Sequence, residues 1–372
     1  KICYNANGSN VVGEMGKQGA YSGTRILYAP NYKRDGYGFA GWNDKFDYTG
    51  TTYGPNQTIT VTDDIETNGL SLYAIWIKSA GILQNWSGCS GMSVGDVTAL
   101  TDNRDNDTYA IAKLADNKCW MIENLRLADK DANNNDINLS SINTHNPSLP
   151  LTNSWYYYDT QTSITTSNHL SPTTDPTQVI WCDFHGGGGI ESERACTDQS
   201  MLATNNTTFF IDNYDDDTSY KYYDESSNVY SYGNYYNWYS ATAGHGKLDN
   251  NSGYIAPGDI CPAGWHLPTG GTIGEFYNLN MSLNNGNTDS AASNKIRSYP
   301  NNLVLSGHVL PTSYILDRGS HGYYLTSTAF DGAYSVDYQV YSAHIAEYNI
   351  YPGTIEANKY EGQMIRCVSD NI

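Results

Sequence analysis

Cys261-Pro-Ala-Gly-Trp-His-Leu-Pro268 and Met364-Ile-Arg-Cys-Val368 are the two stretches of this sequence that most constrain its fold. The first has the pattern of a turn that leads into a helix, and the second that of a short, mostly apolar strand near the end of the chain. A disulfide between Cys261 and Cys367 would join the start of the last hundred or so residues to their end. On the chain-entropy model, closing a loop of that size stabilises a fold by roughly 4–5 kcal/mol. The surface between the two cysteines would then be free to vary, which is the plan of a binding scaffold.

The other cysteines extend this framework. Seven occur, at positions 3, 89, 119, 182, 196, 261 and 367, and no C-x-x-C motif is present, so the basic signal of a zinc ribbon is missing. Six fall into pairs that are neighbours along the chain, and we predict the disulfides Cys89–Cys119, Cys182–Cys196 and Cys261–Cys367. Spacing alone leaves other connectivities open. Cys3 is left over as either a small buried residue or a cysteine that pairs outside this chain, and such bonds would indicate an oxidising compartment.

Composition narrows the class of protein. The 372 residues suffice for two or three domains. The net charge of −19 argues against binding to nucleic acids or anionic membranes, because their phosphates would be repelled. There are 33 tyrosines against 7 phenylalanines, and tyrosine suits a surface that must stay hydrated yet hold a ligand. No apolar run is long enough to span a membrane, and we predict an extracellular, cell-surface protein that is secreted or anchored through segments outside this chain.

Residues 1–79 read as a small, mostly β module, with one helical or irregular stretch near 14–20. Thr58-Ile-Thr-Val-Thr62 alternates with the period of a strand. The runs G-Y-G-F-A-G-W-N-D (36–44) and L-Y-A-I-W (72–76) resemble the internalin-type B-repeat, also called the Listeria–Bacteroides repeat. The resemblance implies a β-grasp-like spacer module of bacterial surface proteins.

Residues 80–88 read as a Ser/Gly linker, and 89–372 as a second domain with a long loop-rich insertion at about 128–230. Within it, Ile273, Phe276, Tyr277 and Leu279 fit one face of a helix over 272–279. Six runs resemble the Fibrobacter-type major paralogous domain (FISUMP): L-T-D-N-R-D-N-D-T-Y (100–109), C-W-M-I-E-N-L (119–125), Y-G-N-Y-Y-N-W (232–238), C-P-A-G-W-H-L-P-T (261–269), Y-L-T-S-T (324–328) and M-I-R-C-V (364–368). This resemblance implies a C-type-lectin-like α+β fold in which the terminal strand pairs near the start of the domain and a disulfide locks it.

The tyrosine-rich segment 321–351 is the candidate binding region, because in lectin-like folds the late part of the domain forms the ligand face. Rigid rings with polar tips suit a glycan or a protein ligand. Alternation predicts that Asp337, Gln339 and Tyr341 point outward. The alternative is that these are half-buried sheet residues of a tyrosine-rich protein. The predicted ligand-binding residues are Tyr323, Asp337, Gln339, Tyr341, His344, Tyr348, Asn349 and Tyr351.

Signals for chemistry are weak. The spacing Asp129-x-Asp131-x-Asn133-x-Asn135 resembles half of a calcium loop, but the glycine and glutamate that complete such a loop are missing. A solvated turn is the simpler interpretation, and a structural calcium remains an option without a defined site. We predict no cofactor and no catalytic residues, and we interpret His266 as a packed or capping residue. The leading hypothesis is a non-catalytic adhesion protein that recognises a glycan or protein on another surface. The alternatives are a structural subunit that assembles with copies of itself and a carbohydrate-active enzyme.

Overall fold

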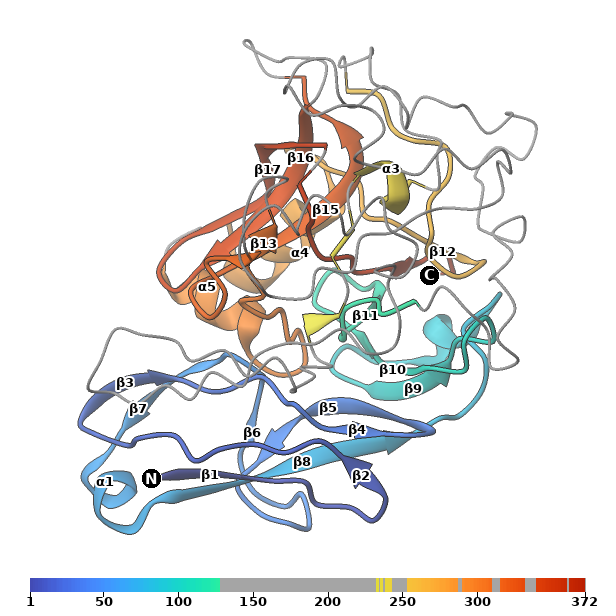
Figure 1. Ribbon diagram of the computed structural model, residues 1–372. Coiled ribbons are helices and arrows are strands. Elements are labelled where there is room, and N and C mark those ends of the chain that lie inside the picture. Colours follow the sequence, from blue (N-terminus) through green and yellow to red (C-terminus); the bar gives the residue numbers. More distant parts are fainter. Residues whose placement is uncertain are drawn as a thin grey trace.

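The computed structural model describes residues 1–127, 232–233, 235–236, 238–242, 253–286, 290–309, 315–331, 339–359 and 361–371. These residues form a mixed α+β fold that is mostly β-sheet with few helices (Figure 1). The chain is arranged in two parts, an N-terminal module and a larger head above it in that view. Four features of the sequence analysis lie outside the described residues: the predicted insertion, the predicted Cys182–Cys196 bond, the Asp/Asn run at 129–135 and Asp337.

The N-terminal module is built from short strands around an aromatic core. Its main sheet has the order β1-β8-β5-β6, with β1 parallel to β8 and the other neighbours antiparallel. Trp42 and Trp76 pack edge-on against Phe39 in the core, at ring distances of 5.1 and 5.8 Å. The strands are β1 (Ile2–Asn5), β2 (Val11–Val12), β3 (Gly23–Ile26), β4 (Lys33–Arg34), β5 (Tyr37–Asn43), β6 (Thr52–Tyr53), β7 (Thr58–Val61) and β8 (Leu70–Lys78).

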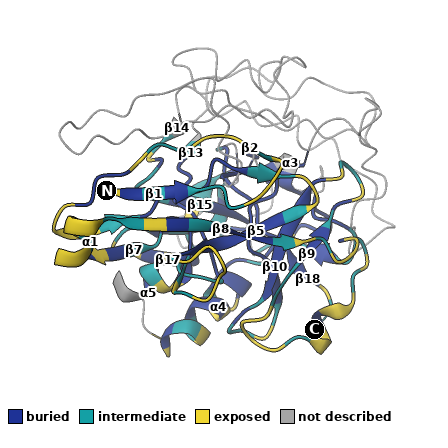
Figure 2. Cartoon of the chain, turned by 90° about the horizontal axis from the view of Figure 1, so that it is seen from below, coloured by how far each residue is buried: buried dark blue, intermediate teal, exposed yellow. Residues whose placement is uncertain are grey.

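The stretch near 14–20, expected to be helical or irregular, is irregular, with an isolated bridge at Gln18. The helix of the module is α1 (Asp63–Asn68), which follows β7 directly. The side chain of Thr62 accepts a hydrogen bond from the backbone N–H of Ile65. Acidic residues in the first turn interact favourably with the positive end of the helix dipole. Gly69 ends the helix at φ 82°, a conformation that side chains disfavour. Because α1 has no buried residue, hydrophobic periodicity could not reveal it (Figure 2).

The module packs directly on the head. Gly38 of β5 lies so close to the backbone of Ala110 that a Cβ there would clash. Glu123 is buried and accepts hydrogen bonds from the backbone N–H groups of Phe39 and Ala110, at 3.0 and 2.7 Å. The buried guanidinium of Arg297 donates to the backbone oxygen of Asn56 in the module. These buried polar groups have their hydrogen-bond partners across the boundary between the module and the head. Separating the two parts would leave the groups unpaired, so the contacts hold the module in position.

The expected linker at 80–88 also belongs to the packed structure. Leu83 is fully buried in the core of the head, and its backbone N–H donates to the oxygen of Thr101 at 2.9 Å. Its backbone oxygen accepts the indole N–H of Trp265 at 2.8 Å. This segment is therefore hydrogen-bonded to the head, and its Leu83 side chain is part of the core of the head.

The base of the head is a five-stranded sheet of order β12-β18-β11-β10-β9. Its strands are β9 (Val97–Thr101), β10 (Thr108–Lys113), β11 (Cys119–Met121), β12 (Trp265–His266) and β18 (Val368–Ser369), and the single-turn helix η1 (Gly88–Gly91) precedes it. The last strand, β18, lies between β11 and β12 and pairs antiparallel with both. The end of the chain is thus held within the sheet that the head begins with.

A second, three-stranded antiparallel sheet of order β15-β16-β17 stands on this base. It comprises β15 (His321–Ala329), β16 (Gln339–Ala346) and β17 (Ile350–Asn358), beside a small hairpin of β13 (His308–Val309) and β14 (Ile315–Leu316). The helices are α3 (Trp238–Ala241), α4 (Glu275–Asn284) and α5 (Ser290–Arg297). Phe276 and Leu279 of α4 are buried as predicted, but Ile273 precedes the helix and is 87% exposed, so its assignment to the buried face is wrong.

Candidate functional site

The candidate site is a row of aromatic rings across the three-stranded sheet. Tyr323 of β15 lies opposite His344 of β16, and His344 lies opposite Tyr351 of β17. The rings of Tyr323 and His344 are nearly parallel, with centroids 4.5 Å apart and planes inclined by 5°. The rings of His344 and Tyr351 are 5.7 Å apart and inclined by 16°. Cross-strand aromatic pairs of this kind stabilise a sheet and hold the rings in fixed positions.

Two further histidines complete the group. His308 of β13 lies 4.2 Å from the ring of Tyr323, and His321 of β15 stacks on His344 at 5.1 Å. We call His308, His321, Tyr323, His344 and Tyr351 the imidazole–tyrosine cluster. The cluster draws its rings from the three-stranded sheet and from the hairpin that precedes β15. It therefore exists only in the folded state.

The imidazole of His344 has an unusual environment. Both of its ring nitrogens are buried, and neither has a hydrogen-bond partner among the residues that the structure describes. Burial, followed by the nearby His321 and His308, lowers the pKa of His344 to about 4. Burial also lowers the pKa of His308. Both histidines are therefore neutral at physiological pH, and burial raises the pKa of the Tyr323 hydroxyl, which also stays neutral.

Strict alternation along β16 divides the predicted binding residues between two faces of the sheet. Gln339 and Tyr341 share a face, whereas His344 points to the other side. The ring of Tyr341 packs edge-on against Phe330 at 4.9 Å, and its hydroxyl donates to Asp331. Burial and this contact raise the pKa of Tyr341 to about 12. Tyr341 and Gln339 are thus separate from the imidazole–tyrosine cluster, and the two positions do not form one continuous face with His344.

The other predicted residues lie at the end of the sheet. Tyr348 and Asn349 are exposed in the turn between β16 and β17, and Tyr348 is 62% exposed. Tyr351 follows at the start of β17 with 45% of its surface exposed. The structure therefore brings together Tyr323, His344 and Tyr351, with the turn residues next to Tyr351 along the chain.

Sequence reasoning left His308 and His321 out of the predicted binding residues. His321 carried a signal, because it precedes Tyr323 by two positions and alternation places both on one face. His308 carried none, because β13 reaches the cluster through tertiary packing alone.

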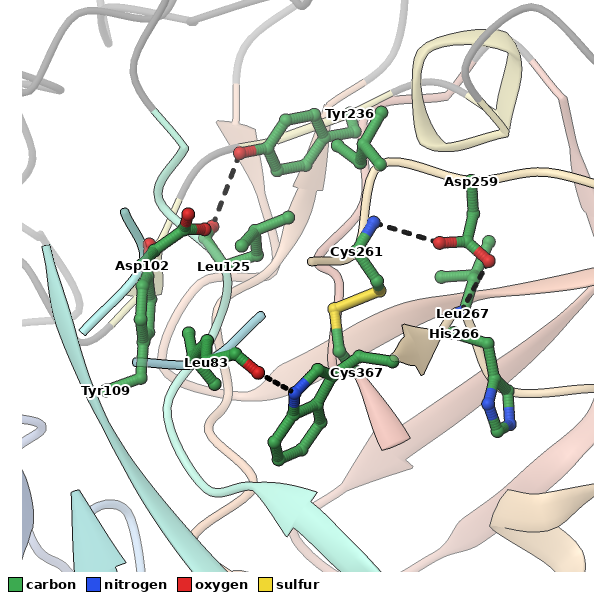
Figure 3. The surroundings of a disulfide bond; sticks show 12 residues. Leu83, Asp102, Tyr109, Leu125, Tyr236, Asp259, Cys261, His266, Leu267 and Cys367 are labelled. Atoms are coloured by element: carbon green, nitrogen blue, oxygen red, sulfur yellow. Dashed lines mark hydrogen bonds between the residues drawn. A yellow bond between two sulfur atoms is a disulfide. The ribbon is translucent and has the colours of Figure 1, made fainter. Parts of the chain in front are cut away.

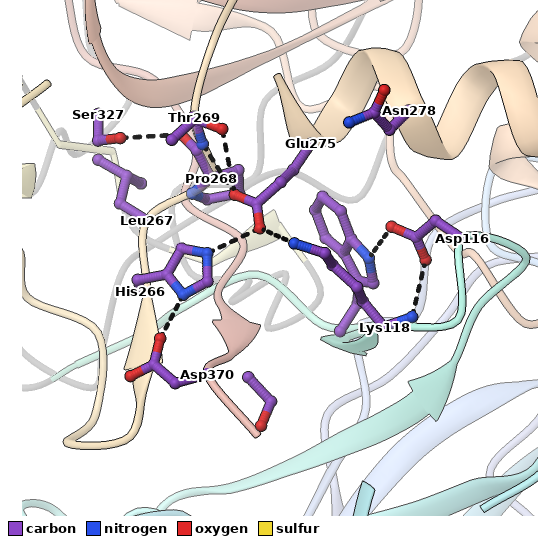
Figure 4. A network of polar contacts seen from close by, with 12 residues as sticks. Asp116, Lys118, His266, Leu267, Pro268, Thr269, Glu275, Asn278, Ser327 and Asp370 are labelled. Carbon is purple, nitrogen blue, oxygen red and sulfur yellow. Dashed lines mark hydrogen bonds and ion pairs between the residues drawn. The ribbon is translucent and has the colours of Figure 1, made fainter. Parts of the chain in front are cut away.

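A second group of charged residues lies at the base of the head (Figure 4). The ring of His266 contacts Asp370 through Nδ1 and Glu275 through Nε2, the latter at 2.8 Å. The ammonium of Lys118 donates to the same Glu275 oxygen at 2.7 Å, and the backbone N–H of Thr269 donates to the other oxygen at 2.9 Å. This network joins β12, α4 and the two ends of the head.

The network fixes the charges of its members. Burial alone would lower the pKa of His266, but hydrogen bonds to Asp370 and Glu275 outweigh it and raise this pKa to about 10. Burial alone would raise the pKa of Glu275, but hydrogen bonds from His266 and Lys118 lower it to about 2. Since both ring nitrogens of His266 face carboxylates, this histidine is bound as an imidazolium and is not available as a general base. Its interpretation as a packed or capping residue stays a prediction.

The disulfides predicted from the first and last cysteine pairs of the head are present. Cys261–Cys367 joins the turn before β12 to the segment before β18, and Cys89–Cys119 joins η1 to β11. Around Cys261, the carboxylate of Asp259 accepts the backbone N–H groups of Cys261 and Leu267, at 2.9 and 3.0 Å (Figure 3). Cys3 is unbonded and half-buried.

Among the described residues, no three His, Cys, Asp or Glu side chains are grouped so that they could hold a metal ion. None of the helices in the described parts of the chain has the length and apolar character needed to span a bilayer.

Comparison with known proteins identifies the N-terminal module. Residues 1–74 match the family model of the Listeria-Bacteroides repeat domain, as the aromatic motifs in this part of the sequence predicted. This repeat is typical of surface proteins, so the match is consistent with a surface-associated, extracellular location. Neither a search of curated proteins nor one of solved structures finds a match to the chain.

Proposed function

We propose that this chain is a non-catalytic surface protein that binds a glycan or a protein through the imidazole–tyrosine cluster and the adjacent turn at Tyr348 and Asn349. The observation that carries this proposal is the row of Tyr323, His344 and Tyr351, whose rings are ordered by the sheet and end in exposed tyrosines. Ordered tyrosines offer a large contact area at a low entropic cost. The match of residues 1–74 to a repeat typical of surface proteins supports the location.

We further propose that the head has the C-type-lectin-like arrangement of the domain family that its six sequence runs resemble. Two features support this. The final strand β18 pairs with β11 near the start of the head, and Cys261–Cys367 ties the segment before β18 to the turn before β12. In such an arrangement a rigid base carries a variable upper part, and here the base holds both described disulfides.

The ring geometry indicates how a ligand would be contacted. Because Tyr323, His344 and Tyr351 stack on one another, their inner faces are already occupied. A ligand would therefore meet ring edges and hydroxyl groups along the row, and a free ring surface at Tyr351 and Tyr348. This arrangement favours hydrogen bonds to a hydroxyl-rich or amide-rich ligand, such as a glycan or a peptide, with one or two ring contacts at the end.

The test is a binding screen of the purified chain against glycans and cell surfaces, with and without a chelator, followed by substitution of Tyr351. We expect Tyr351→Ala to weaken binding by roughly 10-fold or more, as is typical of a tyrosine at the centre of a contact. The matched control is Tyr21→Ala, since Tyr21 is an equally exposed tyrosine (49%) on the N-terminal module. Equal effects of both substitutions, or no bound ligand at all, would contradict the proposal. Self-association that buries Tyr351 between copies would instead favour the structural-subunit alternative.

A further inference from the structure

We propose that the imidazole–tyrosine cluster is a proton-sensitive switch, which keeps the binding face packed near neutral pH and loosens it on mild acidification, so that the ligand is released. The inference rests on the proposed function, because it describes the regulation of the same site. It requires a packed form, with neutral imidazoles, and a locally opened form, in which water reaches the rings.

His344 has no hydrogen-bond acceptor at either ring nitrogen among the described residues. An imidazolium carries two N–H donors, and each needs an acceptor when it is buried. In the packed form, both ring nitrogens of His344 are enclosed without a partner in the described part of the molecule. Tyr323 and Tyr351 occupy the two faces of its ring. A proton on His344 would therefore leave a charged donor unsatisfied in the packed form, whereas water would satisfy it in the opened form.

The neighbouring histidines also disfavour a proton on His344. His321 of β15 lies 5.1 Å from His344, and His308 of β13 is close enough to act on it, so further protons would place like charges side by side. Neither Tyr323 nor Tyr351, whose rings stack on His344, carries a carboxylate. The titratable groups that face His344 from β13, β15 and β17 thus offer no negative charge.

Asp317, in the turn after β14, is the carboxylate that acts on this group. Its Oδ2 lies 4.0 Å from Nδ1 of His308 and accepts the Tyr323 hydroxyl at 3.4 Å. Glu361 acts on Tyr323 and is not among the groups that shift the pKa of His344. Asp317 is therefore placed to favour a charge on His308, and His344 keeps no carboxylate of its own among these residues.

The pH range follows from the direction of the shift. In an opened, hydrated form His344 has an ordinary pKa near 6.5, while burial holds its pKa near 4 in the packed form. The packed form is thus fully favoured above pH 6.5, and this preference is lost as the pH falls toward 4. At pH 5 the proton on His344 alone shifts the equilibrium toward the opened form by at most roughly 30-fold, a figure that solvent screening at this half-buried ring reduces.

The experiment is an NMR titration of the full chain, with the histidine rings labelled, between pH 7.5 and 4. The signal of His344 is identified by its loss in His344→Phe, which keeps a ring in the stack and removes the titrating group. We expect the wild-type signals from β15, β16 and β17 to change reversibly below pH 6.5. In His344→Phe, this change should be absent or much smaller. Should that variant fail to fold, hydrogen exchange of wild-type amides in 339–346 at pH 7 and pH 5, corrected for the intrinsic rate, gives the same readout.

The proposal is overturned if His344 titrates near pH 6.5 while the signals of the three strands stay constant, or if His344→Phe shows the wild-type transition. These readouts contain no ligand, so they are independent of the binding screen. A ligand that binds through Tyr351 equally well at pH 7.4 and pH 5 would refute the switch and leave the proposed function intact. A spectral transition in a chain that binds nothing would refute the proposed function alone.

Discussion

His266 and His344 belong to the same head, yet the surroundings of their ring nitrogens are opposite. Both nitrogens of His266 face carboxylates, and its pKa is raised to about 10. Both nitrogens of His344 are buried without a partner in the described structure, and its pKa is lowered to about 4. Burial opposes the charge in each case, so the difference comes from the partners alone.

The base of the head is a scaffold with compensated charges, whereas the imidazole–tyrosine cluster is a surface that we expect to respond to pH. At the base, the charges of His266, Glu275 and Lys118 compensate one another and connect elements that are distant in the sequence. In the imidazole–tyrosine cluster, the rings of β15, β16 and β17 are held by packing, and Asp317, the carboxylate beside His308, makes no hydrogen bond to His344. The base should thus tolerate a wide pH range, while the cluster should respond to acid.

The largest expected effect concerns the disulfides of the base. Replacing Cys261 and Cys367 by alanine should lower the free energy of unfolding by about 4–5 kcal/mol, since the bond closes a loop with a sequence separation of 106. Removal of Cys89–Cys119, with a separation of 30, should cost about 3.5 kcal/mol. Denaturant-induced unfolding measures both, and Cys3→Ser serves as the control because Cys3 forms no bond. Equal, negligible losses for both bonds would show that the base does not depend on its disulfides.

The next effect tests the charge network. Glu275→Ala should destabilise the head by about 3 kcal/mol, because it leaves the ammonium of Lys118 and one nitrogen of His266 without their buried partner. The folded-state pKa of Glu275 is depressed, so its contribution is complete above pH 4.5 and disappears as the pH falls toward 2. Thermal or denaturant unfolding at pH 7 and pH 3 measures this dependence.

The control for this substitution is Glu356→Ala, which removes an exposed carboxylate from β17 and should change stability by no more than about 0.5 kcal/mol. A similar loss for both variants would contradict the distinction between a compensated buried network and ordinary surface charge.

Part of this arrangement could be predicted from the sequence. Pairing the cysteines that are neighbours along the chain predicted both described disulfides. The sequence predicted strands over 323–328 and 333–341. The first lies within β15, and the described end of the second, Gln339–Tyr341, begins β16. The aromatic motifs of residues 1–79 predicted the N-terminal repeat, since large rings at fixed intervals define its core.

The remainder depended on tertiary contacts. The opposite faces of Tyr341 and His344 follow from one strand, but the cross-strand row depends on bulges in the partner strands, between Leu325 and Ala329 and opposite Ala343. No local pattern reports such bulges. The position of His308 beside Tyr323 depends on how the β13–β14 hairpin folds back onto β15. The docking of the module on the head through Glu123 arises from segments far apart in the sequence.

One titration compares the two histidines most directly. In a single sample of the full chain with labelled histidine rings, NMR follows His266 and His344 from pH 4 to pH 10. The account predicts that His266 stays protonated across the neutral range and loses its proton near pH 10, while His344 is neutral at pH 7 and takes up a proton only well below pH 6.5. Titration of both rings together near pH 6.5 would contradict the division into a compensated base and a proton-sensitive face.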